Sequence, residues 1–210
     1  MPGAPLCDTC IRVLAGPGDT ACLRCGHPWA YEVPTCAECP AGVAWARHAA
    51  AYDPALARVI SALKDSGRRA LGAPLAQLMI DRIAVPPSGA VLVPVPLSPR
   101  RLRQRGFNQA GVLASYLART WGTPVMEVLA RPDDGRHQRG ASRGDRLVQV
   151  RDVFTCAGRA PYHAVLVDDV LTTGATVTAA ARALRAAGCA RVGAVVTARV
   201  VLASGRTRVG

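Results

Sequence analysis

The segment from residue 165 to residue 176 restricts the possible folds of this chain more than any other stretch. Residues 165–167 are all apolar, and such a run is typical of a buried strand in a parallel sheet. Two adjacent carboxylates, Asp168 and Asp169, follow the run directly. Two charges at the end of a buried strand are costly unless they have a task, and open α/β sheets bind ligands where their parallel strands end. We therefore expect Asp168 and Asp169 to lie in a binding site.

A polar turn follows the acidic pair and leads into an amphipathic pattern that predicts a helix over 174–187. The turn contributes five candidate binding residues, which are Thr172, Thr173, Gly174, Ala175 and Thr176. The first amides of the helix, the helix dipole and the threonine hydroxyls suit a phosphate, and Gly174 permits a close approach of the backbone. The neighbouring carboxylates would repel a bare phosphate. We therefore expect a ligand that also offers hydroxyls or a divalent cation, as a ribose 5-phosphate does.

Two other interpretations fit this segment less well. One is an Asp-Asp turn that only caps a helix, which leaves the cost of burying two charges unexplained. The other is the phosphate loop of nucleoside triphosphatases. That loop requires a Gly-Lys pair followed by Ser or Thr, and the segment 165–176 has no lysine.

Strand and helix patterns alternate over the rest of the chain. Short apolar runs predict strands at 91–97, 164–170 and 191–200. Periodic apolar positions predict helices at 54–63, 70–84 and 109–120, the last of them capped by Asn108. This alternation predicts an α/β fold in which helices flank a parallel sheet.

The charge balance favours anionic partners such as nucleic acid, nucleotides or phosphorylated sugars. The 210 residues carry a formal net charge of +12, with 25 Arg and a single lysine, Lys64. Eleven of the arginines lie between residues 100 and 151. One interpretation of this strip is a basic mouth, that is, an arginine-rich entrance to a site, which binds pyrophosphate or single-stranded DNA. The other interpretation is an ordinary solvated surface. The lone lysine suggests that an ammonium is needed at that position, because Arg and Lys are not equivalent.

Six of the eight cysteines form three CxxC pairs near the beginning of the chain, which are Cys7 with Cys10, Cys22 with Cys25, and Cys36 with Cys39. A segment this short cannot bury enough apolar surface to fold alone, so it needs a metal or disulfides. In a reducing cytoplasm such pairs are more often zinc ligands than disulfides. No apolar run reaches the ~20 residues of a membrane span, and a signal-peptide centre is missing. We therefore predict a soluble, cytoplasmic protein.

Two CxxC pairs supply the four thiolates of a closed tetrahedral zinc site, so three pairs leave one pair over. The spacing leaves two sets open, one made of Cys22, Cys25, Cys36 and Cys39, the other of Cys7, Cys10, Cys22 and Cys25. His27 and His48 are weaker candidates for substitute ligands.

Further motifs narrow the possibilities to one family. The segment 165–176 closely resembles the motif with which type I phosphoribosyltransferases bind 5-phosphoribosyl 1-diphosphate (PRPP). The chain as a whole resembles the ComF/GntX family over nearly its full length. Besides the CxxC pairs, this resemblance rests on Leu63-Lys64, Val93-Pro-Val-Pro-Leu97, Arg101, Arg105-Gly-Phe-Asn-Gln-Ala110, Gln138, Arg146 and Phe154.

The resemblance implies a type I phosphoribosyltransferase fold behind a small zinc module, and a link to DNA uptake in natural competence. It implies that Asp168 and Asp169 hold the ribose 2′- and 3′-hydroxyls, and that residues 172–176 hold the 5-phosphate. Arg101 and Arg105 are then the cations nearest the pyrophosphate, which Mg²⁺ accompanies. Lys64 either reaches the pyrophosphate or is an ordinary surface lysine.

The chain departs from the family pattern at two places. Gln149 stands where the family usually has Asn, three residues after Arg146. Longer members carry a further CxxC pair ahead of the first pair of this chain. Without that upstream pair, Cys7 and Cys10 lack partners, which favours the zinc ligand set formed by Cys22, Cys25, Cys36 and Cys39.

Three regions and two functions follow as expectations. The regions are a cysteine-rich zinc module over 1–46, a phosphoribosyltransferase-like domain over 47–203 and a flexible tail over 204–210. The first function is transfer of the phosphoribosyl group of PRPP to an unidentified nitrogen acceptor, with Asp168, Asp169, Lys64 and Arg105 as the catalytic group. The second is non-catalytic, either as a PRPP or nucleotide sensor or as an accessory factor that handles single-stranded DNA in natural transformation. Both functions require the same loop.

Overall fold

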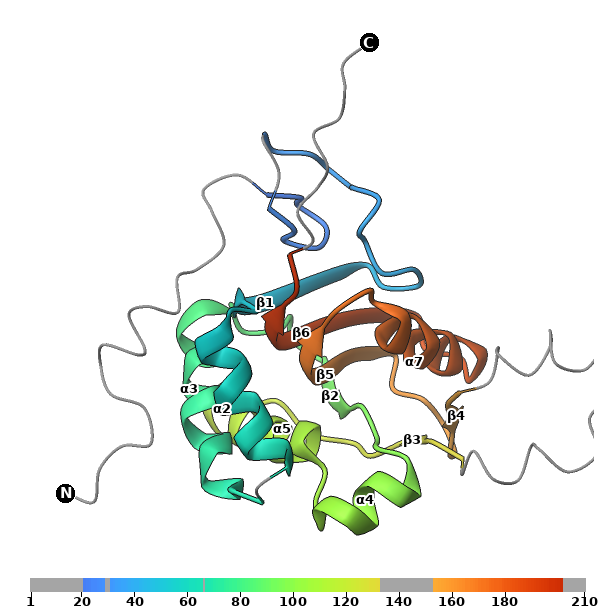
Figure 1. The fold of residues 1–210 in the computed structure, drawn as a ribbon. Helices are drawn as coiled ribbons and strands as arrows, with labels where there is room; N and C mark the ends of the chain where they lie inside the picture. The colour runs from blue at the N-terminus through green and yellow to red at the C-terminus, as the bar shows by residue number, and fades with distance from the viewer. Residues whose placement is uncertain (1–20, 29–30, 66, 133–152, 202–210) are drawn as a thin grey trace, which may run out of the picture.

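A four-stranded parallel sheet forms the centre of the molecule, as Figure 1 shows. The computed structural model describes residues 21–28, 31–65, 67–132 and 153–201. The strands, in their order across the sheet, are β1 (Trp45–Ala51), β6 (Arg191–Arg199), β5 (His163–Leu171) and β2 (Val91–Pro94). All three pairings between them are parallel. The predicted α/β class with a parallel sheet is therefore confirmed.

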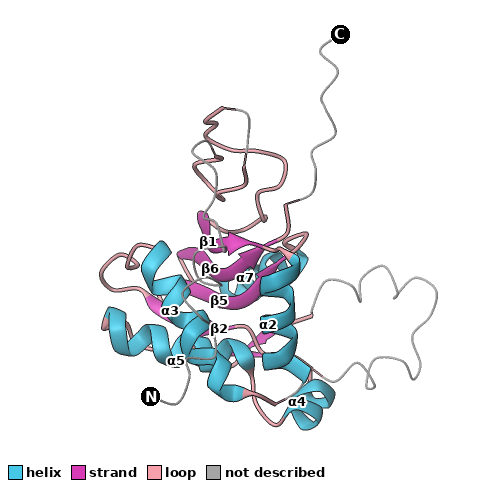
Figure 2. Ribbon diagram, turned by 60° about the vertical axis from the view of Figure 1, so that its left-hand side comes forward, coloured by secondary structure: helices cyan, strands magenta, loops and turns pink. Residues whose placement is uncertain are grey.

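Helices cover both faces of this sheet (Figure 2). One face carries α2 (Pro54–Asp65), α3 (Gly72–Arg82) and α5 (Gln109–Trp121), and the other carries α7 (Ala175–Ala186). The smaller elements are a 3-10 turn (Arg69–Leu71), α4 (Pro99–Arg105), and a two-stranded sheet of β3 (Leu129–Ala130) and β4 (Thr155–Cys156). Within the described residues, no helix is long and apolar enough to cross a membrane.

Strand β5 divides its side chains between two hydrophobic cores. Val165 and Val167 pack into the core on the side of α2, α3 and α5, whereas Leu166 packs into the core on the side of α7. Because side chains alternate along a strand, this register assigns Asp169 to the α2 side and Asp168 to the α7 side. The strand continues through both residues to Leu171, since its pairing with β6 extends to Arg199. The acidic pair thus lies within the end of the strand, not after it.

The predicted elements match the structure where the chain is strongly periodic, and Asn108 caps α5 by accepting a hydrogen bond from the amide of Ala110 (3.1 Å). The run predicted as a strand over 91–97 ends earlier, at Pro94, although the amide of Val95 still donates to the carbonyl of Val167 (3.0 Å). Neither β1 nor α4 was expected. Strand β1 begins at Trp45, and its first residue already pairs with Gly193 of β6.

Gly193 has no room for a side chain. A Cβ built at this position would lie 2.4 Å from two atoms of the Trp45 indole. We expect Gly193→Ala to lower the free energy of unfolding by about 1–3 kcal/mol, the usual cost of overpacking, as measured by urea denaturation. Combining it with Trp45→Leu should recover part of this loss. Equal loss in the single and double variants would show that the indole is not the obstacle.

Candidate functional site

The carboxyl ends of β5 and β2 open into a polar cavity of about 270 Å³. Its charged or hydrogen-bonding lining residues are Lys64, Arg101, Arg105, Gln109, Arg131, Asp168, Asp169, Thr172 and Thr176. They come from α2, α4, α5, the residue after β3, β5 and the turn into α7. The structure thus brings together all the predicted acidic and basic residues of the site.

The turn from β5 into α7 has the geometry of an anion cradle. Gly174 is buried and caps α7 with a left-handed backbone (φ +77°), a conformation that favours glycine. The hydroxyl of Thr173 accepts from the amide of Ala175 (3.4 Å), which fixes the start of the helix. Thr172 and Thr176 line the cavity, whereas Thr173, Gly174 and Ala175, which were also predicted as binding residues, are not among its lining residues. The first amides of a helix have no partner within it, so those of α7 that follow Ala175 can donate to an anion.

The acidic pair is buried and held in place. Asp169 is 4% exposed and forms an ion pair with the Lys64 ammonium of α2. Asp168 is 9% exposed, and its carboxylate accepts the amide of Asp169 (2.9 Å). Burial and the neighbouring Asp169 carboxylate raise the pKa of Asp168 well above its usual range, while Lys64 acts in the opposite direction. A ligand that brings hydroxyls or a cation would relieve this cost.

Four cations surround the two carboxylates in the cavity, namely Lys64, Arg101, Arg105 and Arg131. Helix α4 presents Arg101 and Arg105, and Ser98 caps that helix by accepting the amide of Arg101 (3.4 Å). The guanidinium of Arg105 is oriented by a hydrogen bond to Gln109 (3.2 Å) and by Asp65 at 3.7 Å. With more cations than carboxylates, the cavity suits a ligand that carries several negative charges.

Arg131 and Gln109 line the cavity but were not singled out as site residues. Arg131 lies over the ring of Phe154, 5.6 Å from its centroid, and its buried Nε has no hydrogen-bond partner among the described residues. Arg131 follows β3, which has only two residues, and a strand of that length leaves no periodic signal. Gln109 did lie in a quoted motif, and its role became visible only through its contact with Arg105.

Four thiols lie close together in the N-terminal part of the described chain. They belong to Cys22, Cys25, Cys36 and Cys39. Their sulfur atoms all lie within 4.8 Å of one another, at 3.5 Å for Cys22 with Cys39 and 3.6 Å for Cys25 with Cys36. Four sulfurs around a tetrahedral zinc ion, with Zn–S bonds of about 2.3 Å, lie about 3.8 Å apart. The cluster therefore fits a metal ion such as zinc.

This is the ligand set that the sequence favoured. Cys7 and Cys10, the members of the other set, lie outside the described residues. Neither His27 nor His48 belongs to the cluster found in the described part of the chain. Burial raises the pKa of Cys25. Burial also acts on Cys39, but hydrogen bonds from Thr35 and from the amide of Cys36 outweigh it and lower the pKa of Cys39 to about 7.

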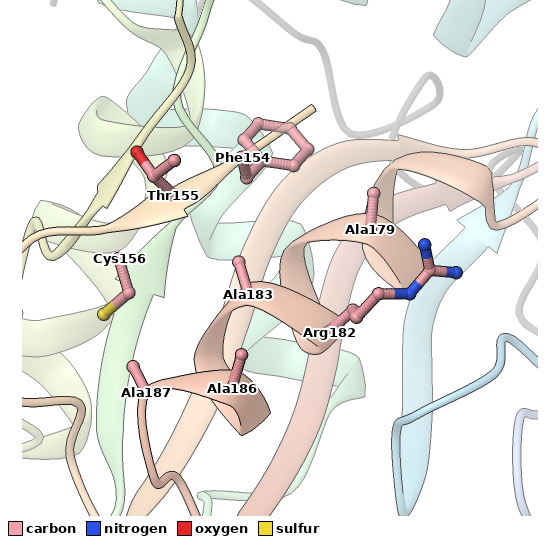
Figure 3. Close-up of a pocket in the computed structure, with 8 residues that line it drawn as sticks. All are labelled: Phe154, Thr155, Cys156, Ala179, Arg182, Ala183, Ala186 and Ala187. Carbon is pink, nitrogen blue, oxygen red and sulfur yellow. The ribbon is translucent and has the colours of Figure 1, made fainter. Parts of the chain in front are cut away.

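A second hollow, of about 520 Å³, lies between α7 and the β4 region (Figure 3). One wall is formed by three alanines of α7 and by Ala187, directly after the helix. The other wall is formed by Phe154, Thr155 and Cys156. Figure 3 shows the Arg182 side chain extending away from Cys156. None of the predicted site residues lies here, and the alanine wall offers no donors for a phosphate.

Comparison with known proteins agrees with this geometry. A model of the phosphoribosyl transferase domain matches residues 106–206. The DNA utilization protein YhgH of Escherichia coli O157:H7 is 32% identical over 209 residues, which cover 89% of this chain and 87% of that protein. The chain belongs to the ComF family of phosphoribosyltransferase-like proteins.

Two further relatives of the ComF family match over shorter regions. Competence protein F of Haemophilus influenzae is 37% identical over 102 residues, which cover 46% of this chain and 44% of that protein. Competence protein ComFC of Bacillus subtilis is 38% identical over 95 residues, which cover 45% of this chain and 38% of that protein. These matches confirm the resemblance to the ComF family that the sequence motifs indicated.

Proposed function

We propose that this protein binds PRPP in the cavity at the end of β5. The observation that carries the proposal is the juxtaposition of a buried carboxylate pair, an anion cradle and four cations in one cavity of about 270 Å³. A bare phosphate would need no carboxylates, and a neutral sugar would need no cations. A ribose that carries a phosphate at one end and a pyrophosphate at the other uses all three features.

In this proposal each group has its own task. The turn over 172–176 and the first amides of α7 bind the 5-phosphate, and Asp168 and Asp169 accept hydrogen bonds from the ribose hydroxyls. Arg101, Arg105 and Arg131 neutralise the pyrophosphate. The Lys64 ammonium, which is paired with Asp169, orients that carboxylate and reaches toward the pyrophosphate.

Mg²⁺ is part of the same proposal. Asp168 and Asp169 provide the hard oxygen ligands that this ion prefers, and Mg²⁺ would neutralise charge on the pyrophosphate. If the protein is a transferase, its arginines stabilise the departing pyrophosphate while the acidic pair fixes the sugar, whose C1 becomes positively charged. The described part of the cavity shows no candidate base for an acceptor beyond these carboxylates. We infer a nitrogen acceptor that needs no deprotonation by the protein, such as ammonia or an amine.

Pyrophosphate release distinguishes transfer from binding alone. We would incubate the protein with Mg-PRPP and a panel of ammonia, amines and nucleobases, and follow pyrophosphate. Acceptor-dependent release that disappears in Asp168→Asn with Asp169→Asn is expected of a transferase. If PRPP binds but no acceptor raises the release above the uncatalysed rate, the non-catalytic alternative is the better description.

The names of the relatives favour a second role in handling DNA. The proteins named above are called competence proteins and a DNA utilization protein, and this chain has a net charge of +12. We infer weak, salt-sensitive binding of single-stranded DNA through the basic mouth of the cavity. We expect Arg101→Glu, Arg103→Glu and Arg105→Glu together to reduce binding at least about tenfold at low salt, because three phosphate contacts are lost. Fluorescence anisotropy with a labelled oligonucleotide measures the affinity for single-stranded DNA.

A matched control makes the same change in net charge away from the cavity. It replaces three exposed arginines outside the cavity by glutamate, namely Arg58, Arg68 and Arg82. If both triple variants lose binding equally, only net charge matters and the basic mouth has no special role. If the unmodified protein fails to bind DNA even at low salt, the accessory role loses its physical basis.

The cysteine cluster completes the proposal. We propose that Cys22, Cys25, Cys36 and Cys39 hold one structural Zn²⁺, which would fold a segment that is too short to have a core of its own. Free thiols of this kind persist in a reducing compartment, so we also propose a cytoplasmic location. We also propose a zinc module over 1–46 and a phosphoribosyltransferase-like domain over 47–203, although β1 of the sheet already begins at Trp45.

A further inference from the structure

We propose that the metal-bearing cysteine segment positions the phosphate loop, so that loss of the metal, or of the contact between Ala41 and Thr178, weakens binding of the 5-phosphate. The inference rests on the ribose-phosphate site proposed above. It assigns a positioning role to Pro40, Ala41 and Thr178, none of which lines the cavity. Three contacts between the segment and the phosphoribosyltransferase-like fold carry it.

The first contact joins the cysteine segment to the capping glycine of α7. Pro40, directly after Cys39, is buried, and so is Gly174. A Cβ at Gly174 would lie 3.1 Å from Cγ and 3.2 Å from Cβ of Pro40, so the proline ring packs on the backbone of the phosphate loop. This contact restricts the space around Gly174, so the position of the turn depends on Pro40.

The second contact is a hydrogen bond across 137 residues of sequence. The amide of Ala41 donates to the hydroxyl of Thr178 at 3.1 Å. Thr178 lies in the first turn of α7, and its own amide donates to the carbonyl of Gly174 (2.8 Å). The bond from Ala41 thus holds the same helical turn whose free amides face the phosphate. Ala41 follows the last cysteine of the cluster by two residues, so its position depends on that cluster.

The third contact ties the cysteine cluster to the sheet through a buried charge. Arg199, at the end of β6, is 1% exposed and donates to the carbonyls of Cys25 (3.1 Å) and Glu38 (2.8 Å). Its strand pairs with β5 at Leu171, the residue before the phosphate loop. Four thiolates around Zn²⁺ leave a net negative charge, which the buried guanidinium offsets. If the metal leaves and the four thiolates take up protons, the cluster becomes neutral and this attraction to Arg199 is lost.

These contacts form a path from the metal to the phosphate. The metal fixes Cys36 and Cys39, which fix the turn that leads to Pro40 and Ala41. That turn fixes Gly174 and the first turn of α7. If this turn is displaced, the cavity keeps its carboxylates and cations, but the loop proposed to bind the 5-phosphate loses its contacts with Pro40 and Ala41. Binding of the 5-phosphate should therefore suffer more than binding of free pyrophosphate, whose arginines lie on α4 and after β3.

The first test uses Thr178→Val and Thr178→Ser in the full, zinc-loaded chain. Valine keeps the shape of threonine but cannot accept the Ala41 amide, whereas serine can. We expect Thr178→Val to raise the Kd for Mg-PRPP about 2- to 5-fold, because the lost hydrogen bond is exposed and acts on the ligand only through the loop. We expect it to leave the Kd for pyrophosphate and the zinc content unchanged, and Thr178→Ser to restore PRPP binding. Unchanged PRPP affinity in Thr178→Val would overturn the inference.

The second test needs no ligand. Hydrogen exchange of the protein would be compared before and after metal removal under reducing conditions. We expect faster exchange over residues 171–178 and unchanged exchange in α3 and α5, which lie on the other face of the sheet. Equal exchange over 171–178 in the two forms would contradict the coupling. A rise over α3 and α5 as well would show that the metal holds the whole fold, which also contradicts a specific link to the loop.

The two tests separate this inference from the proposed function. If the unmodified protein does not bind Mg-PRPP, the proposed function fails, while the exchange experiment still decides whether the metal positions the loop. If the protein binds PRPP and neither the Thr178 variants nor metal removal affects it, the proposed function stands and this inference fails.

Discussion

Replacing Asp168 and Asp169 together by asparagine should weaken Mg-PRPP binding at least about 100-fold while the protein stays folded. Asparagine is close to aspartate in size, so the packing at the end of β5 should survive. An amide oxygen still accepts a hydrogen bond, but the charge-assisted bonds to the ribose hydroxyls are lost, at ~1.5–3 kcal/mol each. Isothermal titration calorimetry of the variant and the unmodified protein measures the effect.

Free pyrophosphate should respond to the same change with the opposite sign. Removing both carboxylates leaves four cations and no carboxylate among the residues that line the cavity, which should strengthen binding of a bare polyanion. The matched control removes two exposed carboxylates outside the cavity, with Asp81→Asn and Glu127→Gln. This control should leave PRPP binding within about twofold. Equal weakening of PRPP and pyrophosphate in the Asp168 and Asp169 variant would mean that it has lost structure.

Metal removal should have the second large effect. We expect about one Zn²⁺ per chain by elemental analysis, because the four clustered thiols satisfy one tetrahedral site. A structural zinc site of this kind binds with an apparent ~10–16 kcal/mol, so chelation should unfold the cysteine segment. The sheet and the helices of the α2, α3 and α5 face have their own core and should remain folded. Far-UV circular dichroism and exchange by mass spectrometry distinguish these two parts.

A pair of single variants controls the metal prediction. Cys36→Ser removes one thiol of the cluster and should reduce the zinc content at least about tenfold. Cys156→Ser removes a free thiol outside the cluster and should leave the zinc content unchanged. Purified protein that is folded, has reduced thiols and contains no metal would contradict the zinc site. So would equal zinc loss in both variants.

The sequence predicted the parts of the fold that leave a strong local pattern. An apolar run, two acids and a Thr-Thr-Gly turn predicted β5, the turn after it and α7, because the pattern of each element is local in the chain. The acidic pair and Thr172 meet in one cavity for the same reason. Asn108 signalled the start of α5 because an N-cap is a local hydrogen bond.

Other features depend on contacts that no local pattern records. Strand β1 is rich in alanine, which has low strand propensity, and it exists because β6 pairs with it. Arg131 reaches the cavity from a two-residue strand. The contact of Pro40 with Gly174 joins two segments far apart in sequence. Such contacts form only once the sheet is assembled, so no local sequence pattern predicts them.

We propose that the cavity recognises a ribose bearing both a phosphate and a pyrophosphate. The most direct measurement titrates the unmodified, zinc-loaded protein by calorimetry with Mg-PRPP, ribose 5-phosphate and Mg-pyrophosphate in turn. We predict one PRPP site per chain, with a Kd for PRPP at least about tenfold lower than for either fragment, because only PRPP engages the cradle, the carboxylates and the arginines together. A Kd for PRPP equal to that for pyrophosphate would contradict the claim, since the ribose and its 5-phosphate would then contribute nothing.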